Sequence, residues 1–196
     1  GADGTVQLWD PAHPDEPTTA FTGHRDGVND PSNDDVYAVI QLADGRVASG
    51  GDDGTLQIWN PDQPGSILDR YTQHHERAGS DDADAVWSLA ELPDGRIASG
   101  SADGEVHLWT PGRPGSTAVV YTGHYEAAAD PNDDAVRAIV PLVGGLIASG
   151  GADGTVRIWN PARTDQTIAT FTGHADRATG SDTDSVRAIA QLANGW

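Results

Sequence analysis

The chain of 196 residues carries 30 Asp and Glu against 11 Lys and Arg, a formal net charge of −19, and has the length of a single domain. Such a charge repels phosphate backbones and anionic lipid, so neither a nucleic acid nor a membrane surface is expected as a partner, and no apolar run approaches the ~20 residues of a membrane span. Cysteine is absent, which excludes disulfides, thiolate metal sites and cysteine nucleophiles. Nothing in the residues assigns a cellular compartment, and the cytoplasm is only the default.

The sequence repeats itself every fifty residues, without insertion or deletion. The segments GADGT, GDDGT, SADGE and GADGT begin at Gly1, Gly51, Ser101 and Gly151, and a tryptophan and a histidine recur at the same spacing. A period of this length indicates a repeat architecture. We therefore expect one unit over residues 1–196, built from repeats at approximately 1–50, 51–100, 101–150 and 151–196.

Each repeat divides into short β-strands separated by turn residues. In the first complete set the strands are expected at Val36–Leu42, Val47–Gly50, Thr55–Trp59 and Ile67–Thr72. Asp44-Gly45 and Asp53-Gly54 suit tight hairpin turns, while Pro61 and Pro64 mark a loop. Four strands joined by hairpins form one antiparallel sheet per repeat, and stacking such sheets radially buries both of their faces.

A family resemblance rests on motifs that the third and fourth repeats show best: Gly123-His124, Val136–Ile139, Leu146–Gly150 and Asp153–Asn160. These segments resemble the WD40 repeat, with its Gly-His pair, its V-x-A-[LI] strand, its A-S-G strand end and its D-G-T-V-x-[LI]-W-[DN] segment. The same motif recurs about four times over nearly the whole chain, which makes it highly specific. The resemblance implies an all-β fold, a WD40-type β-propeller whose blades are four-stranded antiparallel sheets, with four blades' worth of sheets per chain.

The resemblance also implies a buried hydrogen-bonded network in each blade. It joins a tryptophan, a serine, the histidine after glycine and the aspartate of the tight turn. The sets are His24, Ser49, Asp53 and Trp59; His74, Ser99, Asp103 and Trp109; His124, Ser149, Asp153 and Trp159; and His174, Asp3 and Trp9, which lacks its serine. Because a fully satisfied network of this kind rigidifies a blade, we expect structural rather than catalytic histidines.

Three features depart from the family pattern. Gln73 replaces the glycine before His74, and the loop from each such histidine to the next strand is longer than usual, at about eleven residues. The segment 193–196 reads Ala-Asn-Gly-Trp, where the other repeats read Asp-Gly-Arg or Gly-Gly-Leu and continue into Ala-Ser-Gly.

The first and last segments are expected to be two parts of one blade. Residues 1–22 would supply its outer strands and residues 184–196 an inner strand. Because a two-stranded ribbon is marginal in water and exposes a pairing edge, we expect the two parts to complete one another. They could do so within one chain, as a four-bladed ring, or between two chains. The resemblance to rings of about seven or eight blades favours a twofold homodimer that closes an eight-bladed ring. A piece of a longer open array is the alternative.

A variable column in the first strand of each repeat is the candidate binding site. It reads Tyr37, Trp87, Arg137 and Arg187, whereas the preceding residue is always valine. By the family's geometry this column lies near the mouth of the central channel. Large aromatic and arginine side chains are typical of binding hot spots. Filling of the channel by bulky side chains is an equally favoured interpretation.

The long loops between histidine and strand carry acidic residues that could bind a cation. Asp130, Asn132 and Asp134 present side-chain oxygens at alternate positions, as do Asp30, Ser32 and Asp34, and Ca²⁺ prefers oxygen ligands. The glycine and glutamate of an EF-hand are missing, however, so this calcium site is a weak candidate. Solvated acidic loops are favoured, and neither a metal nor a cofactor is expected.

These observations favour a non-enzymatic scaffold that binds a protein or peptide, possibly a basic one, and associates with itself. A symmetric repeat module with no ligand beyond self-association is the alternative. An enzyme with a site at the channel mouth is less favoured, because no convergent set of unassigned His or Glu residues was found.

Overall fold

The computed structural model describes residues 1–24, 34–74, 85–113, 119–124, 134–174 and 185–192. These residues form β-strands and no α-helix, so the all-β fold is confirmed. Accordingly, none of the described segments is a helix with the length and hydrophobicity needed to cross a bilayer.

Three described sheets have four antiparallel strands, and a further sheet has two. The two-stranded sheet pairs β1 (Val6–Asp10) with β2 (His13–Phe21). The others contain β3 (Val36–Gln41), β4 (Val47–Gly51), β5 (Leu56–Asn60) and β6 (Gln63–Tyr71); β7 (Val86–Glu91), β8 (Ile97–Ser101), β9 (Val106–Trp109) and β10 (Val119–Tyr121); and β11 (Val136–Pro141), β12 (Ile147–Gly151), β13 (Val156–Asn160) and β14 (Arg163–Phe171). The four-stranded antiparallel blades expected from the sequence are therefore present.

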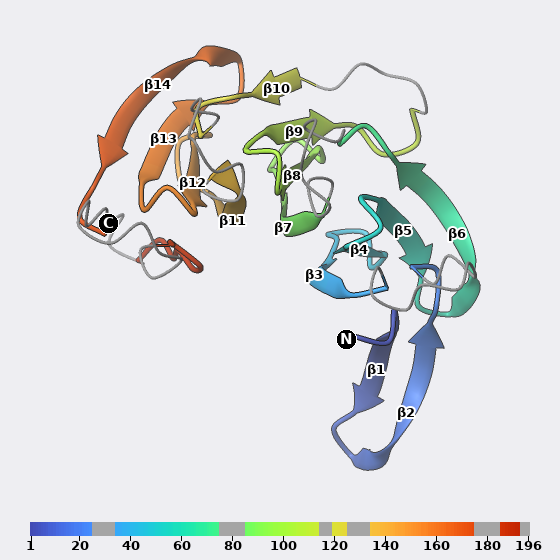
Figure 1. The fold of residues 1–196 in the computed structure, drawn as a ribbon. Coiled ribbons are helices and arrows are strands. Elements are labelled where there is room, and N and C mark those ends of the chain that lie inside the picture. Colours follow the sequence, from blue (N-terminus) through green and yellow to red (C-terminus); the bar gives the residue numbers. More distant parts are fainter. Residues whose placement is uncertain (25–33, 75–84, 114–118, 125–133, 175–184, 193–196) are drawn as a thin grey trace.

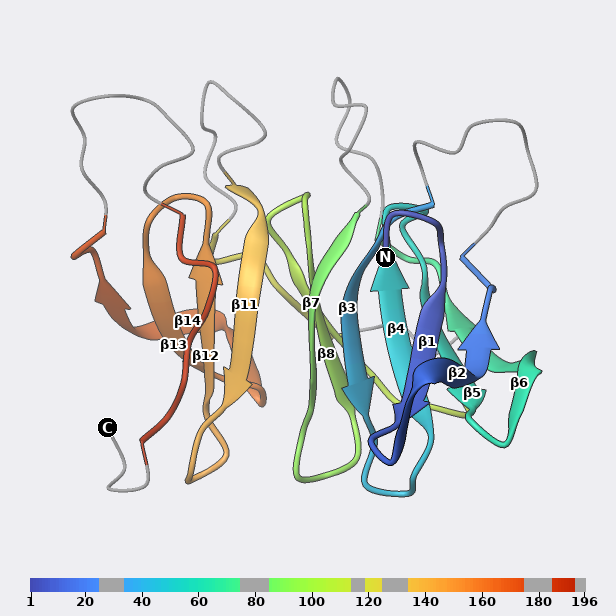
Figure 2. The ribbon, with the colours of Figure 1, turned by 90° about the horizontal axis from the view of Figure 1, so that it is seen from below.

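The sheets stand side by side around an open arc, with β3, β7 and β11 on its inner side and β6, β10 and β14 on its outer side (Figure 1). The strands run along the axis of the arc, as the view from below shows (Figure 2). The β1–β2 sheet lies at one end of the arc and residues 185–192 lie at the other (Figure 1). The two ends therefore do not meet within the chain, and the alternative of a four-bladed ring closed in cis is not observed.

The hydrophobic core lies at the junctions between neighbouring sheets. One cluster joins Leu56 and Ile58 on β5 to Val86 on β7 and Ile97 on β8. A second cluster makes the equivalent contacts between the next two sheets. Each blade is therefore stabilised mainly by its neighbours.

Glycines near the ends of β4, β8 and β12 allow this close packing. A Cβ atom on them would fall against a valine Cγ1 of the next inner strand: 2.5 Å at Gly50 (Val86), 2.7 Å at Gly100 (Val136) and 2.6 Å at Gly150 (Val186). The Ala-Ser-Gly motif thus ends in glycine because no side chain fits there.

Residues 185–192 occupy the inner-strand position of a further blade, although no strand is assigned to them. Val186 is buried, and its N–H donates to the carbonyl oxygen of Gly151 at 2.9 Å. The equivalent bond joins Val36 N–H to the Gly1 carbonyl at 3.1 Å. The β1–β2 sheet thus holds two strands at one end of the arc, and residues 185–192 lie in an inner-strand position at the other end.

The outer strand begins earlier than the sequence suggested. The prediction placed a loop at Pro61 and Pro64 and a strand from Ile67, whereas β6 begins at Gln63. The side chain of Asn60 accepts a hydrogen bond from Asp62 N–H at 2.9 Å, which closes a tight turn directly after β5. Pro64 is tolerated because β6 is an edge strand of its sheet.

Candidate functional site

The structure brings three of the four expected hydrogen-bonded sets together, each at a junction between sheets. In one set, His24 Nε2 lies 2.8 Å from Ser49 Oγ, and His24 Nδ1 lies 3.1 Å from the Asp53 carboxylate. The Trp59 indole N–H donates to Ser49 Oγ at 3.4 Å. Because the histidine follows β2 whereas its partners lie in the β3–β6 sheet, the network ties one blade to the next.

The same contacts recur one and two blades further along the arc. His74 lies 2.8 Å from Ser99 Oγ and 3.4 Å from Asp103 Oδ2. His124 lies 2.8 Å from Ser149 Oγ and 3.2 Å from Asp153 Oδ2, and Trp159 N–H donates to Ser149 at 3.2 Å. The buried Trp109 N–H has no acceptor within the described residues, so this set differs from the other two.

Burial and hydrogen bonding shift the pKa of His74 and of Asp153 in these networks. Burial lowers the pKa of His74, which favours its neutral form. Burial raises the pKa of Asp153, but hydrogen bonds and charge interactions with His124, together with donors from Thr155, outweigh this effect and hold that pKa below its usual value. The histidines are enclosed by structural partners, which leaves no open position for a reacting group.

Each internal junction also stacks two aromatic rings. Phe21 lies on Trp59 with ring centroids 4.6 Å apart, Tyr71 on Trp109 at 5.2 Å, and Tyr121 on Trp159 at 4.2 Å. The tryptophan comes from the third strand of a blade and its partner from the outer strand of the preceding blade. Stacking and burial together make these rings a major part of the junction energy.

The structure does not bring the fourth set together. Asp3 and Trp9 lie at one end of the arc, and His174 follows β14 near the other. Trp9 is 55% exposed and its expected stacking partner Phe171 is 56% exposed, whereas the equivalent rings at internal junctions are buried.

The variable column lies on the inner side of the arc, on β3, β7 and β11. The rings of Tyr37 on β3 and Trp87 on β7 stack 4.1 Å apart, and the Arg137 guanidinium on β11 lies 4.9 Å from the centre of the Trp87 ring. Tyr37 is 38% exposed. Arg187 follows in the exposed part of residues 185–192. The structure thus places three of these side chains in one continuous stack, with Arg187 beyond it.

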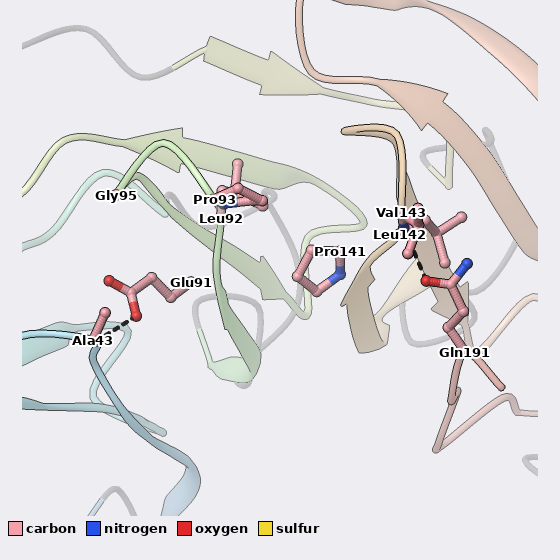
Figure 3. Close-up of a pocket in the computed structure, with 9 residues that line it drawn as sticks. All are labelled: Ala43, Glu91, Leu92, Pro93, Gly95, Pro141, Leu142, Val143 and Gln191. Atoms are coloured by element: carbon pink, nitrogen blue, oxygen red, sulfur yellow. Dashed lines mark hydrogen bonds between the residues drawn. The ribbon is translucent and has the colours of Figure 1, made fainter. Parts of the chain in front are cut away.

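A groove of about 530 Å³ opens where the hairpin turns of neighbouring blades meet (Figure 3). At two junctions a side chain bridges the turns: Glu91 Oε2 accepts from Ala43 N–H at 2.7 Å, and Gln191 Oε1 accepts from Val143 N–H at 2.9 Å. At the junction between these two, prolines replace both the residue that donates the N–H and the residue whose side chain accepts it.

Pro93 has no N–H to donate, and the side chain of Pro141 has no oxygen that could accept a hydrogen bond. The groove is lined mostly by apolar residues, among them the two prolines, Leu92, Leu142 and the 85% exposed Val143, with Glu91 and Gln191 as its polar residues (Figure 3). Sequence reasoning missed this groove. The signal was present in the repeat, because Pro93 and Pro141 both depart from their columns.

Two places could hold a metal. In the calcium candidate, Asp130 and Asn132 lie outside the described residues, as do Asp30 and Ser32, and Asp134 is buried. Within the described residues, His74, Asp103 and His107 place one ligand atom each within 4.8 Å of one another. His107 was also missed from the sequence, although it stands where other repeats carry Gln or Arg.

A family model described as "WD domain, G-beta repeat" matches residues 15–60, 70–110 and 116–160. A search of curated proteins found no match. The first matched segment runs from β2 through β5, so it begins in the outer strand of one sheet and ends in the third strand of the next. The repeat in the sequence is therefore offset by one strand from the four-stranded sheet. The hydrogen-bonded networks show the same offset, because each joins a histidine after the outer strand of one blade to residues of the next blade.

Proposed function

The chain belongs to the WD40 repeat family, whose domains typically serve as non-enzymatic scaffolds for protein interactions, and we propose that it binds a basic protein or peptide and assembles with a second copy of itself. The observation that carries the first part is the stack formed by Tyr37, Trp87 and Arg137 on the inner side of the arc.

This stack offers a partner a rigid aromatic surface. Because Tyr37 and Trp87 hold each other in place, little side-chain entropy is lost when a ligand packs against them. Tyr37 lies at one end of the stack and is the most exposed aromatic ring in it. A lysine or arginine side chain on the exposed face of such a ring gains cation–π attraction.

The net charge favours a basic partner. With a charge of −19 the chain attracts cationic segments over distances of about a Debye length, which accelerates their encounter. The arginines of the column repel such a segment locally, so its basic residues should approach from the Tyr37 end. This arrangement would favour one direction of binding along the arc.

A peptide array tests this proposal. We expect lysine- and arginine-rich synthetic peptides to bind in preference to acidic ones, and Tyr37→Ala and Trp87→Ala to weaken binding about tenfold or more, as hot-spot truncations do. Ile67→Ala is the matched control, because Ile67 is 41% exposed but lies on the outer strand β6. Binding that survives both changes on the inner side would refute the assigned surface.

The second part of the proposal rests on the two ends of the arc. Every internal junction stacks an outer-strand ring on a tryptophan, and the ends present one half of that pair each, as Phe171 and Trp9. His174 and Asp3 are likewise the separated halves of a histidine–aspartate pair. A second copy supplies the complement of each half, so two chains related by a twofold axis would form two equivalent junctions and close an eight-bladed ring.

Light scattering tests this part. We expect the mass of two chains, and the mass of one chain after Trp9→Ala or Phe171→Ala. Ile168→Ala is the control, since Ile168 lies on the same strand β14 as Phe171 and is 57% exposed, but occupies no stacking position. A wild-type mass of one chain at micromolar concentration would refute self-assembly.

The alternatives to a scaffold make different predictions. A module without a ligand beyond itself would form the dimer but bind none of the peptides. An enzyme would show turnover that Tyr37→Ala or Trp87→Ala abolishes. The enclosed histidine networks favour the scaffold.

A further inference from the structure

One blade departs from its sisters at two neighbouring positions of the third strand and its turn. Where the other repeats carry threonine at positions 5, 55 and 155, this one carries Glu105. Where they carry glutamine or arginine two residues later, it carries His107. Both changes replace a hydrogen-bond donor beside the network aspartate with a potential metal ligand.

In the sister blades the aspartate is surrounded by donors. Asp53 Oδ2 receives the Thr55 hydroxyl at 2.9 Å and the Gln57 amide at 3.4 Å. Asp153 Oδ2 receives the Thr155 hydroxyl at 2.8 Å and the Arg157 guanidinium at 3.2 Å. These carboxylates therefore have no lone pair directed at an ion.

Asp103 has a different set of donors. Its Oδ1 accepts from Glu105 N–H at 2.7 Å, and its carboxylate also accepts from the Ser101 side chain. The contact of its Oδ2 with His74 Nδ1 is 3.4 Å, longer than the equivalent contacts of His24 and His124. Around it stand a second carboxylate and a second imidazole. His107 Nε2 lies 2.8 Å from Glu105 Oε2, and the rings of His74 and His107 lie 4.2 Å apart.

We propose that His74, Asp103 and His107 bind a Zn²⁺ ion. Glu105, whose carboxylate lies 2.8 Å from His107 Nε2, would become the fourth ligand by turning toward the other three. Zinc takes four ligands of nitrogen and oxygen type in a tetrahedron at about 2.0–2.2 Å, which spaces the ligand atoms about 3.3–3.6 Å apart. Since the His74, Asp103 and His107 atoms already lie within 4.8 Å of one another, they need to close by no more than about 1.5 Å. The two imidazoles exclude Ca²⁺ and Mg²⁺ as the preferred ion, because those ions select oxygen ligands.

Charge and burial support the assignment. His74, Asp103 and His107 are all buried, and the buried Asp103 carboxylate together with the partly exposed Glu105 carboxylate favours positive charge nearby. One divalent ion balances both. Glu105 has 31% of its side chain exposed and so provides a path of entry from solvent.

Outer contacts hold the two imidazoles in orientation. Tyr71 Oη lies 2.8 Å from His107 Nδ1, and Ser99 Oγ lies 2.8 Å from His74 Nε2. Each ring thus has one nitrogen bonded to a hydroxyl and the other facing a carboxylate. Hydrogen bonds of this kind commonly orient histidine ligands in zinc sites.

The consequence is a metal-locked junction. His74 follows β6 of one blade, and the other ligands lie on or beside β8 and β9 of the next blade. With four protein ligands the site has no open position, which is typical of structural rather than catalytic zinc. The ion would therefore stabilise this junction of the arc selectively.

Zinc titration of the whole chain tests the proposal. We expect one Zn²⁺ per chain in calorimetry, a higher thermal midpoint with zinc, and visible absorption bands of tetrahedral geometry when Co²⁺ replaces it. Excess Ca²⁺ should not displace the ion. Absence of zinc binding in all three measurements would overturn the proposal.

The repeat itself supplies matched variants. Glu105→Thr and His107→Gln introduce residues that the β3–β6 blade carries at the same positions, so the fold should tolerate them. Each should weaken zinc binding at least about tenfold, the lower bound for perturbing a metal site. Conversely, the double variant Thr55→Glu/Gln57→His should gain a second ion at the His24–Asp53 junction. Zinc affinity unchanged in both Glu105→Thr and His107→Gln would place the ion elsewhere and refute the assignment.

Discussion

The four equivalent tryptophans allow junction energy to be measured with an internal control. Trp159 is completely buried, stacks on Tyr121 with an angle of 5° between the rings, and donates to Ser149. Truncating such a side chain, Trp159→Ala, should lower the free energy of unfolding by about 3–5 kcal/mol, because transfer energy, stacking and the cavity all contribute. For a chain of this size the thermal midpoint should fall by about 6–20 °C.

Trp9→Ala makes the same chemical change at the exposed end of the arc. Because Trp9 is 55% exposed, the loss in a single chain should be about 1 kcal/mol or less. If a second copy covers Trp9, its cost should instead grow with protein concentration, as linkage between folding and association requires. Circular dichroism melts at two concentrations separate these terms. Equal shifts for both variants in dilute solution, or a negligible shift for Trp159→Ala, would refute the assignment of junction energy to ring burial.

Three further changes test local features of the blades. Trp159→Phe should cost about 1–2 kcal/mol more than Trp109→Phe in urea unfolding, because only the former loses an indole hydrogen bond, and equal costs would contradict this. Gly100→Ala should destabilise by about 1–3 kcal/mol through overpacking against β11, while Gly65→Ala, with open space around it, should be neutral; similar melts for the two would argue against the close approach. Because the folded pKa of Asp153 is lowered, its stabilising contribution is present above about pH 4 and is lost as the pH falls through the folded value, so Asp153→Asn should show a shallower loss of stability below pH 4 than the wild type.

Local sequence was sufficient to predict most strands and turns. Gly45 in the predicted Asp44-Gly45 turn has a φ of +89°, which favours glycine, and Arg46 bonds to the Asp44 side chain. The start of β6 was predicted four residues late because the two prolines were read as a loop. Whether a proline interrupts a strand depends on whether that strand is at an edge, and sheet order cannot be read from a short window.

Contacts between blades were harder to predict from the sequence than the strands and turns. The family pattern named His74, Asp103 and Trp109 as one set but gave no reason for the Trp109 N–H to lack the serine contact made in the sister blades. The metal cluster and the groove, by contrast, were visible as departures from their columns, and what they meant depended on knowing which side chains face each other across a junction.

Several residues that differ from their equivalents in the other repeats lie in one blade. In the β7–β10 sheet, Pro93 lies in the turn after β7, at one end of the blade, while Glu105 and His107 lie at the turn before β9 and in that strand. Two of these residues lie near a residue of a neighbouring sheet or its connection. Pro93 lines the same groove as Pro141, and the His107 ring lies beside the His74 ring. A substitution at only one of two hydrogen-bonded residues would leave a buried donor or acceptor of the other residue unsatisfied. These differences make the two junctions of the blade chemically unlike the rest of the arc, and the buried Trp109 N–H is left without an acceptor within the described residues.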